Sequence, residues 1–204
     1  MWQLVQSQLA KSLSALEHND KDMAREIIMI EDRVDSSEFL IDSDCRTYMA
    51  LNARESVDLS FAMTTLKINM HLERIGDIAE DIAFFVLNSK QPFSADLFES
   101  TNVLKTFSEG LNLMKIAFQS FITEDVILAK ELIDNNNIPE NINWNTNKQI
   151  IEFVKNYPNQ IDQALHILSI IRNLERVFEQ IRGITEETIS YLDHKENKPI
   201  AERV

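Results

Sequence analysis

Apolar residues recur at spacings of three, four and seven along most of this chain, which is the period of an α-helix with one buried face. The first periodic segment covers residues 2–17 and ends at a polar break, residues 18–20. Two longer segments follow at residues 21–53 and 56–88. The first half of the chain therefore predicts three helices joined by short turns.

The second half shows a similar arrangement. Helices are predicted over residues 95–121, from about Glu124 onward, and over residues 159–193. Three asparagines and a proline interrupt the middle helix at residues 135–139, and these residue types favour a kink or a loop. The polar tail that follows residue 193 is expected to be frayed.

The two halves align as copies of one unit. An offset of 102 residues (174 minus 72) aligns Leu-Glu-Arg-Ile at 72–75 with Leu-Glu-Arg-Val at 174–177. The middle helices align through residues 24–28 and 129–133. We therefore predict an all-α fold of two tandem three-helix bundles, six helices in total. The predicted first repeat covers residues 1–90, the second covers residues 94–194, and the frayed tail covers residues 195–204.

Composition narrows the class of protein. The 3 Gly and 4 Pro are few for 204 residues, which favours long helices, and the net charge of -13 disfavours nucleic acid and anionic membranes as partners. A single cysteine, Cys45, excludes an intramolecular disulfide. The residues after Met1 lack the basic region and the apolar region that would predict a secretion signal, and no apolar run of about 18–20 residues is found in the sequence given. We predict a cytoplasmic protein without a membrane-inserted segment, either free or held at the membrane by a transporter.

Acidic side chains are concentrated on the second and third predicted helices, beside or opposite the apolar face, in pairs four residues apart. Like charges at this spacing repel, and a hard cation would offset the repulsion, because such ions prefer carboxylate ligands. The candidate metal ligands are Glu31, Asp35, Glu73, Asp77, Glu80 and Asp81. The alternative interpretation is that these acids form a solvated helix face.

The aligned acids of the second half are weaker candidates: Glu140, Glu175 and Glu179. Asn136 takes the place of Glu31, and Arg182 is positioned to pair with Glu179 within the same helix. If only one half binds a cation, we expect it to be the first.

No catalytic motif is evident. The four histidines are scattered outside the Glu-x-x-His spacing of helical di-iron sites, and the chain lacks a glycine-rich phosphate loop, a serine elbow and a zinc-protease motif. We therefore predict that the protein is not an enzyme and carries no organic cofactor.

Two sets of segments carry motifs that resemble a known family. The first set is residues 58–59, 66–69 and 72–83, which include Leu-Glu-Arg-Ile-Gly-Asp at 72–77. The second set is residues 157–158, 163–165, 172–177 and 184–187. The two sets resemble the first-half and second-half signatures of the PhoU family of phosphate-uptake regulators. The likeness covers most of the chain, although Phe178 and Glu179 replace the Gly-Asp of the second signature.

The resemblance implies two three-helix bundles and a cytoplasmic, non-enzymatic role in phosphate signalling or transporter control. It also implies a phosphate ABC transporter and a sensor histidine kinase as partners. Some family members bind iron or zinc clusters through Glu/Asp-x-x-x-Asp motifs, which fall here on Glu31 with Asp35 and on Glu73 with Asp77. An all-carboxylate site would accept Fe, Zn, Mg, Mn or Ca.

Three functional interpretations stay open: a free regulator that binds a transporter or kinase, a cytosolic PhoU-like domain of a sodium-dependent phosphate transporter, and a metal-free structural helical module. Membrane spans encoded upstream of Met1 would distinguish the second from the first. The oligomeric state is also open, and a homodimer is one of the alternatives.

Overall fold

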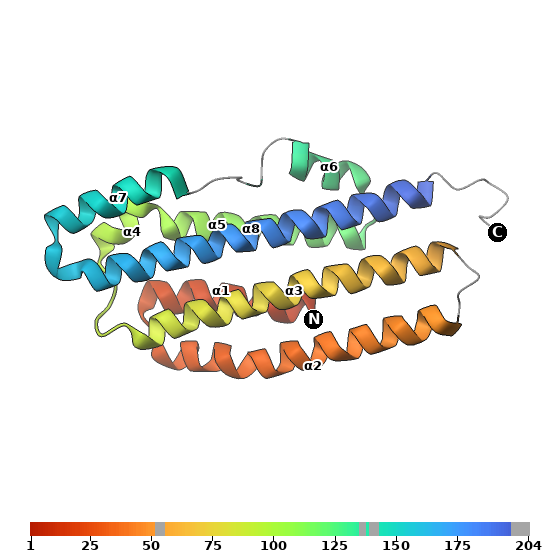
Figure 1. Ribbon diagram of the computed structural model, residues 1–204, viewed down its shortest axis with the longest axis horizontal. Coiled ribbons are helices and arrows are strands. Elements are labelled where there is room, and N and C mark those ends of the chain that lie inside the picture. The colour runs from red at the N-terminus through yellow and green to blue at the C-terminus, as the bar shows by residue number, and fades with distance from the viewer. Residues whose placement is uncertain (52–55, 135–137, 139–142, 197–204) are drawn as a thin grey trace.

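The computed structural model describes residues 1–51, 56–134, 138 and 143–196 (Figure 1). These residues form helices and short connections without a strand, which confirms the all-α prediction for the described part of the chain. The elements are α1 (Trp2–His18), α2 (Lys21–Leu51), α3 (Ser56–Asn88), α4 (Ala95–Thr101), α5 (Val103–Ile122), α6 (Val126–Asp134), α7 (Asn143–Asn156), a 3-10 turn η1 (Pro158–Gln160) and α8 (Ile161–Glu196).

The predicted count of six helices is wrong, because the described residues contain eight α-helices. The helix predicted over residues 95–121 breaks into α4 and α5 at Asn102, which adopts a left-handed conformation with φ 54° and ψ 21°. Asparagine tolerates this conformation better than most residues do. The helix predicted from Glu124 begins at Val126, where Asp125 Oδ1 accepts a hydrogen bond from the Leu128 amide at 3.0 Å.

Two other predictions fall partly outside the described residues. The predicted interruption at 135–139 lies between α6 and α7, and of these positions only Ile138 is described. The last helix extends past its predicted end at residue 193, since α8 continues to Glu196. Residues 197–204 of the predicted tail, and residues 52 and 53 of the second predicted helix, are outside the described part.

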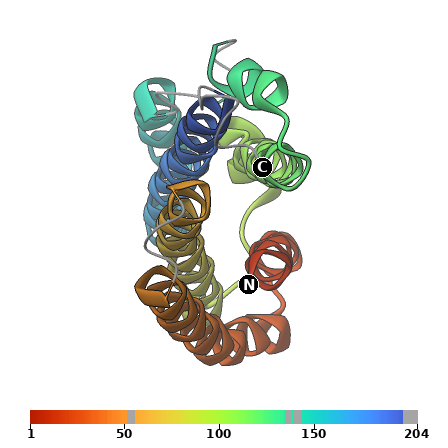
Figure 2. The same ribbon diagram turned by 90° about the vertical axis from the view of Figure 1, so that its right-hand side faces the viewer.

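The helices form two layers, seen end-on in Figure 2. In one layer α2, α3, α8 and α7 lie side by side in that order, and in the other α1, α5 and α6 pack across one face. The long helices α3 and α8 run antiparallel at the centre (Figure 1) and join the two three-helix units. The acidic residues predicted as ligands therefore lie beside the junction between the units.

A single apolar core connects both units. It includes Val5, Ile75 and Ile82 from the first unit and Phe107 and Phe178 from the second, all buried. Apolar side chains of each unit are therefore kept from water partly by the other unit, so the stability of each unit depends on its contact with the other.

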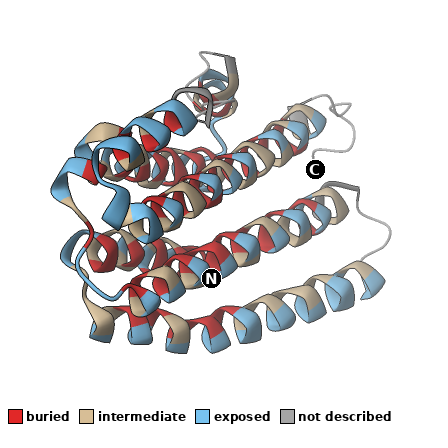
Figure 3. Cartoon of the chain, turned by 60° about the vertical axis from the view of Figure 1, so that its left-hand side comes forward, coloured by how far each residue is buried: buried red, intermediate tan, exposed pale blue. Residues whose placement is uncertain are grey.

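The core does not extend along the whole of α2. From Asp35 to Leu51 none of its residues is buried, as Figure 3 shows for the end of this helix that lies beyond α1. The short α1 covers only the other end of α2 and α3.

Candidate functional site

The acids predicted as metal ligands come from two packed helices. Glu31 and Asp35 lie on α2, and the remaining four lie on α3. We refer to Glu31, Asp35, Glu73, Asp77, Glu80 and Asp81 together as the acidic cluster. Electrostatic coupling links the two helices, because acids of α3 shift the pKa of Glu31 on α2 and Asp35 on α2 shifts those of acids on α3.

Glu31 is the buried member of the acidic cluster, with 6% of its surface exposed. Gln8 of α1 donates a hydrogen bond from Nε2 to Glu31 Oε2, while Glu31 Oε1 has no hydrogen-bond partner among the described residues. Burial raises the pKa of Glu31 to about 7 against the effect of the Gln8 hydrogen bond, and Asp77 and Asp35 add to the rise. Burial therefore favours the neutral form of this carboxyl group far more than it does for an exposed glutamate.

Gly76 on α3 provides the space for the Glu31 carboxylate. A Cβ atom at Gly76 would lie 3.0 Å from Glu31 Oε1 and 3.2 Å from Oε2, and 3.1 Å from Val34 Cγ1. The absence of a side chain thus lets α2 approach α3 with the carboxylate between them.

The acids of α3 are more exposed and repel one another. The pKa values of Glu73, Asp77 and Glu80 are raised, mainly by burial and to a smaller extent by neighbouring carboxylates. Arg176 of α8 opposes the rise at Asp77 and lies 3.8 Å from Asp81, measured from Nη1 to Oδ2. Negative charge therefore accumulates along α2 and α3 with one nearby arginine from the second unit.

The structure does not gather these acids into a closed ligand set. Among the described residues, no group of three or more His, Cys, Asp or Glu side chains is placed to hold one metal ion. Asp35, Asp77 and Asp81 are exposed, so their side chains have room to rotate, while Glu31 is confined. The acids therefore form a row in which only the Glu31 carboxylate is held in place, and one of its two oxygens lacks a hydrogen-bond partner among the described residues.

The second repeat differs at the equivalent place. Phe178, which aligns with Gly76, is buried, and its ring packs 3.6 Å from the position that a Cβ at Gly110 would take. The second repeat thus has a buried ring, packed against α5, at the position where the first repeat has the glycine that lies against a carboxylate. Glu140 lies outside the described residues, Glu175 is half-buried and Glu179 is exposed. Arg182, predicted to pair with Glu179, donates to the Ile138 carbonyl at 3.0 Å.

Sequence reasoning missed Gln8 and the role of Arg176. Gln8 is fully buried on a helix whose neighbouring positions Val5 and Leu9 are apolar and buried. A polar residue on the apolar face of the first predicted helix was the available signal, because buried polar groups need partners. No local pattern links Arg176 to the acidic cluster, since it lies on a distant part of the chain.

We compared the sequence and the fold with those of known proteins. Residues 1–86 and 103–188 each match the PhoU domain. The chain belongs to the PhoU family. The two matches confirm the predicted internal repeat, and the asymmetry between Gly76 and Phe178 is thus a difference between two PhoU domains of one chain.

Curated relatives of this PhoU family chain carry related names. The present chain is 30% identical over 177 residues to the phosphate-specific transport system accessory protein PhoU homolog of Aquifex aeolicus. The aligned region covers 86% of this chain and 79% of that protein. The chain is 26% identical over 188 residues to the homolog of Caulobacter vibrioides, covering 90% and 79%. These proteins are named as transport accessory proteins rather than as enzymes.

Solved PhoU structures share the fold. The crystal structure of PhoU from Pseudomonas aeruginosa matches with a TM-score of 0.85 at 23% identity, covering 95% of this chain and 92% of that one. The phosphate transport system regulatory protein PhoU from Streptococcus pneumoniae matches with a TM-score of 0.78 at 25% identity, covering 98% and 92%. None of the described helices of the present chain has the length and apolar character needed to cross a membrane.

Proposed function

We propose that this chain is a regulatory, non-catalytic accessory protein of phosphate uptake. It acts by binding components of a phosphate transporter, a sensor histidine kinase, or both. The observation that carries the proposal is the PhoU domain match in both repeats, together with a 30% identical relative named as an accessory protein of a phosphate-specific transport system.

The charge of the chain supports a role in protein binding. A net charge of -13 favours association with basic surfaces, and complementary charge speeds encounter and selects among partners. The layer formed by α2, α3, α8 and α7 offers one continuous face to such a partner (Figure 2).

Cross-linking in the native host tests this role. A tagged form that restores phosphate regulation in a strain lacking the gene is cross-linked at low and at high external phosphate, and the bound proteins are identified by mass spectrometry. Transporter components or a sensor kinase should be enriched over a tagged control protein of similar charge. Enrichment of neither class at either phosphate level would contradict the proposal.

We further propose that the acidic cluster binds a divalent or iron cation. The unpartnered Oε1 of buried Glu31 and the mutual repulsion of Glu73, Asp77 and Glu80 support it, because a cation would satisfy the first and relieve the second. The donor set suits Mg, Mn, Ca, Fe or Zn. Binding requires exposed carboxylates such as Asp35 to rotate toward Glu31.

Elemental analysis tests the cation site. Wild-type protein purified without chelator is compared with the variant Glu73→Gln/Asp77→Asn and with the aligned control Glu175→Gln/Glu179→Gln in the second repeat. Wild type and control should carry the same metal, and the first variant should lose it while its circular dichroism is unchanged. Equal metal content in all three proteins would rule out this site.

A further inference from the structure

A polar cavity lies where the connection between the two PhoU domains meets the start of α8. Its volume is about 740 Å³, which is within the range of small-molecule sites. It is lined by residues 88–92, 94, 159, 160, 162, 163, 165 and 166. Figure 1 shows the end of α3 and the beginning of α8 at the same end of the molecule. We call this cavity the linker pocket.

The wall of the linker pocket is held in place by hydrogen bonds. Gln163 of α8 donates from Nε2 to the Pro92 carbonyl at 3.1 Å, and its Oε1 accepts from the Ser94 amide at 3.0 Å. Ser89 donates from Oγ to Asn19 Oδ1 at 2.8 Å and accepts from Lys21 Nζ at 2.8 Å. The linker pocket is therefore formed without a ligand, which lowers the entropic cost of binding one.

Two side chains of opposite charge line the linker pocket without pairing. Lys90 and Asp162 are both exposed, and neither side chain has an ion pair or a hydrogen-bond partner among the described residues. A ligand with a single charge would be attracted by one of them and repelled by the other. A zwitterion satisfies both, with a carboxylate toward Lys90 and an ammonium group toward Asp162.

Carboxamide side chains surround these two charges. Asn88, Gln91, Asn159 and Gln160 all line the linker pocket. Each carboxamide offers a donor and an acceptor, as a peptide group does. Gln160 Oε1 has no hydrogen-bond partner among the described residues, so no hydrogen bond keeps this amide from turning toward a donor on a ligand. The lining thus matches a ligand that has peptide groups between its charged ends.

The apolar part of the lining is small. Leu165 is 52% exposed and lines the linker pocket beside His166. The His166 ring is backed by Phe85 of α3, with 5.5 Å between the ring centroids. One aliphatic side chain on a fixed support offers contact to a small apolar group rather than to a large one.

We propose that the linker pocket binds a short peptide with free termini, its carboxylate on Lys90 and its ammonium group on Asp162. The carboxamides bind the peptide groups, and Leu165 contacts a small side chain. The linker pocket contains no member of the acidic cluster. The inference goes beyond the proposed function, since neither partner binding nor cation binding requires this site.

Peptide titration of the full chain tests the inference. The probe is trialanine, and the comparison peptides are N-acetyl-trialanine and trialanine amide, each of which lacks one of the two charges. Each peptide is added to about 10 mM to protein labelled with nitrogen-15, and backbone amide shifts are followed by NMR. Trialanine should give saturable shifts at residues 88–91 and 159–166. Each capped peptide should bind at least about tenfold more weakly.

Two substitutions assign the two charges of the linker pocket. Lys90→Gln should bind trialanine and its amide with equal affinity, because the partner of the capped carboxylate is gone. Asp162→Asn should likewise bind trialanine and N-acetyl-trialanine with equal affinity. The controls Lys115→Gln on α5 and Glu186→Gln near the other end of α8 change exposed residues outside the linker pocket. Both should bind trialanine within about twofold of wild type. Circular dichroism establishes that all four variants fold.

Four outcomes would overturn the inference, and none of them requires a variant to fold. They are the absence of a saturable shift with trialanine, equal binding of the three peptides, shifts confined to residues outside the linker pocket, and binding of AMP or inorganic phosphate there in place of trialanine. The last would mean that the linker pocket takes an anion alone. The proposed function is tested separately, since capture of transporter components in the native host does not depend on trialanine.

Discussion

The imidazole of His71 lies directly against Gly183, where the two central helices meet. A Cβ atom at Gly183 would lie 2.4 Å from His71 Cε1 and 2.6 Å from Nε2. His71 Nδ1 lies 2.8 Å from Gln180 Oε1, which holds the ring in this position. Contact between α3 and α8, and hence between the two PhoU domains, depends on the missing side chain at Gly183.

Gly183→Ala should therefore destabilise the protein. Displacing the His71 ring costs more than alanine gains in helix propensity, so we expect a net loss of about 1–2 kcal/mol in the free energy of unfolding. Gly110→Ala is the matched control, because the nearest atoms of Phe178 would lie at 3.6 Å, an ordinary contact. It should stabilise by about 0.5–1 kcal/mol. Urea denaturation measures both changes, and stabilisation by both substitutions would contradict the packing described.

The raised pKa of Glu31 predicts a pH-dependent stability. Its folded-state pKa of about 7 exceeds the ordinary value of 4.5, so the folded protein binds this proton more tightly than the unfolded chain does. Ionisation of Glu31 should lower stability progressively between these two values and fully above about 7, by on the order of 3 kcal/mol.

Glu31→Gln removes this ionisation. With a chelator present, the variant should be more stable than wild type at about pH 8 and close to wild type at about pH 4. Asp44→Asn, on the exposed part of the same helix, is the control and should show no such difference. Thermal unfolding across this pH range measures the effect. A Glu31→Gln curve parallel to that of wild type would show that Glu31 ionises normally in the folded state.

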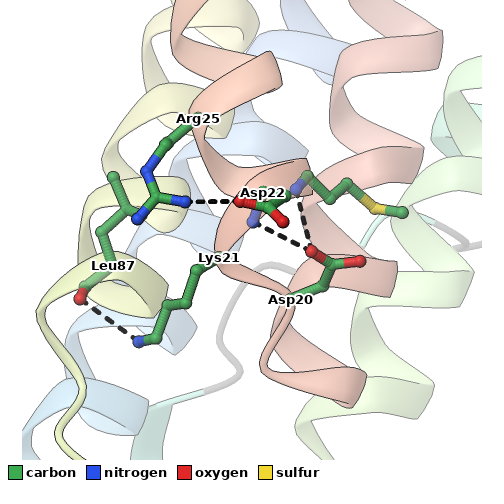
Figure 4. Close-up of polar contacts among 6 residues, drawn as sticks. Asp20, Lys21, Asp22, Arg25 and Leu87 are labelled. Atoms are coloured by element: carbon green, nitrogen blue, oxygen red, sulfur yellow. Dashed lines mark hydrogen bonds and ion pairs between the residues drawn. The ribbon is translucent and has the colours of Figure 1, made fainter.

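Lys21 should stabilise the end of α3. Its ammonium group donates to the carbonyls of Val86, Leu87 at 3.2 Å and Ser89 at 2.8 Å, and Figure 4 shows the Leu87 contact beside the Asp22–Arg25 pair. The last carbonyls of a helix lack donors within the helix. Lys21→Met should therefore lower the free energy of unfolding by about 1–3 kcal/mol.

Arg25→Met is the matched control for Lys21→Met. Arg25 pairs with Asp22 at 2.5 Å, but both side chains are largely exposed, so its loss should change stability by no more than about 0.5 kcal/mol. Equal effects of the two substitutions in urea denaturation would mean that the carbonyls of α3 do not depend on Lys21.

The sequence was sufficient for the helices and the repeat because apolar periodicity reports which face of a helix is buried. It was insufficient at Asn102, where one left-handed residue divides a periodic segment without altering its pattern. The alignment of Gly76 with Phe178 was readable, but its consequence was not. Only the packed structure shows that Gly76 lies against the Glu31 carboxylate, whereas the Phe178 ring packs against Gly110.

The sequence was sufficient to predict which residues belong to the candidate site, but not how they are buried and packed against one another. Spacing alone placed Glu31 and Asp35 together, yet one is buried and the other exposed. The difference depends on where α1 crosses α2 and on Gln8, a contact between distant parts of the chain that no local pattern specifies. Whether the acidic cluster binds a cation is a separate prediction, which elemental analysis tests.

The most direct test of the regulatory role is the rate of phosphate uptake in the host that encodes this protein. Uptake is measured at low and high external phosphate in wild type, in a strain lacking the gene, and in that strain carrying the gene again. We expect that uptake in the strain lacking the gene no longer follows external phosphate and that the restored gene returns the response. Uptake that responds to phosphate equally in all three strains would contradict a role in phosphate regulation.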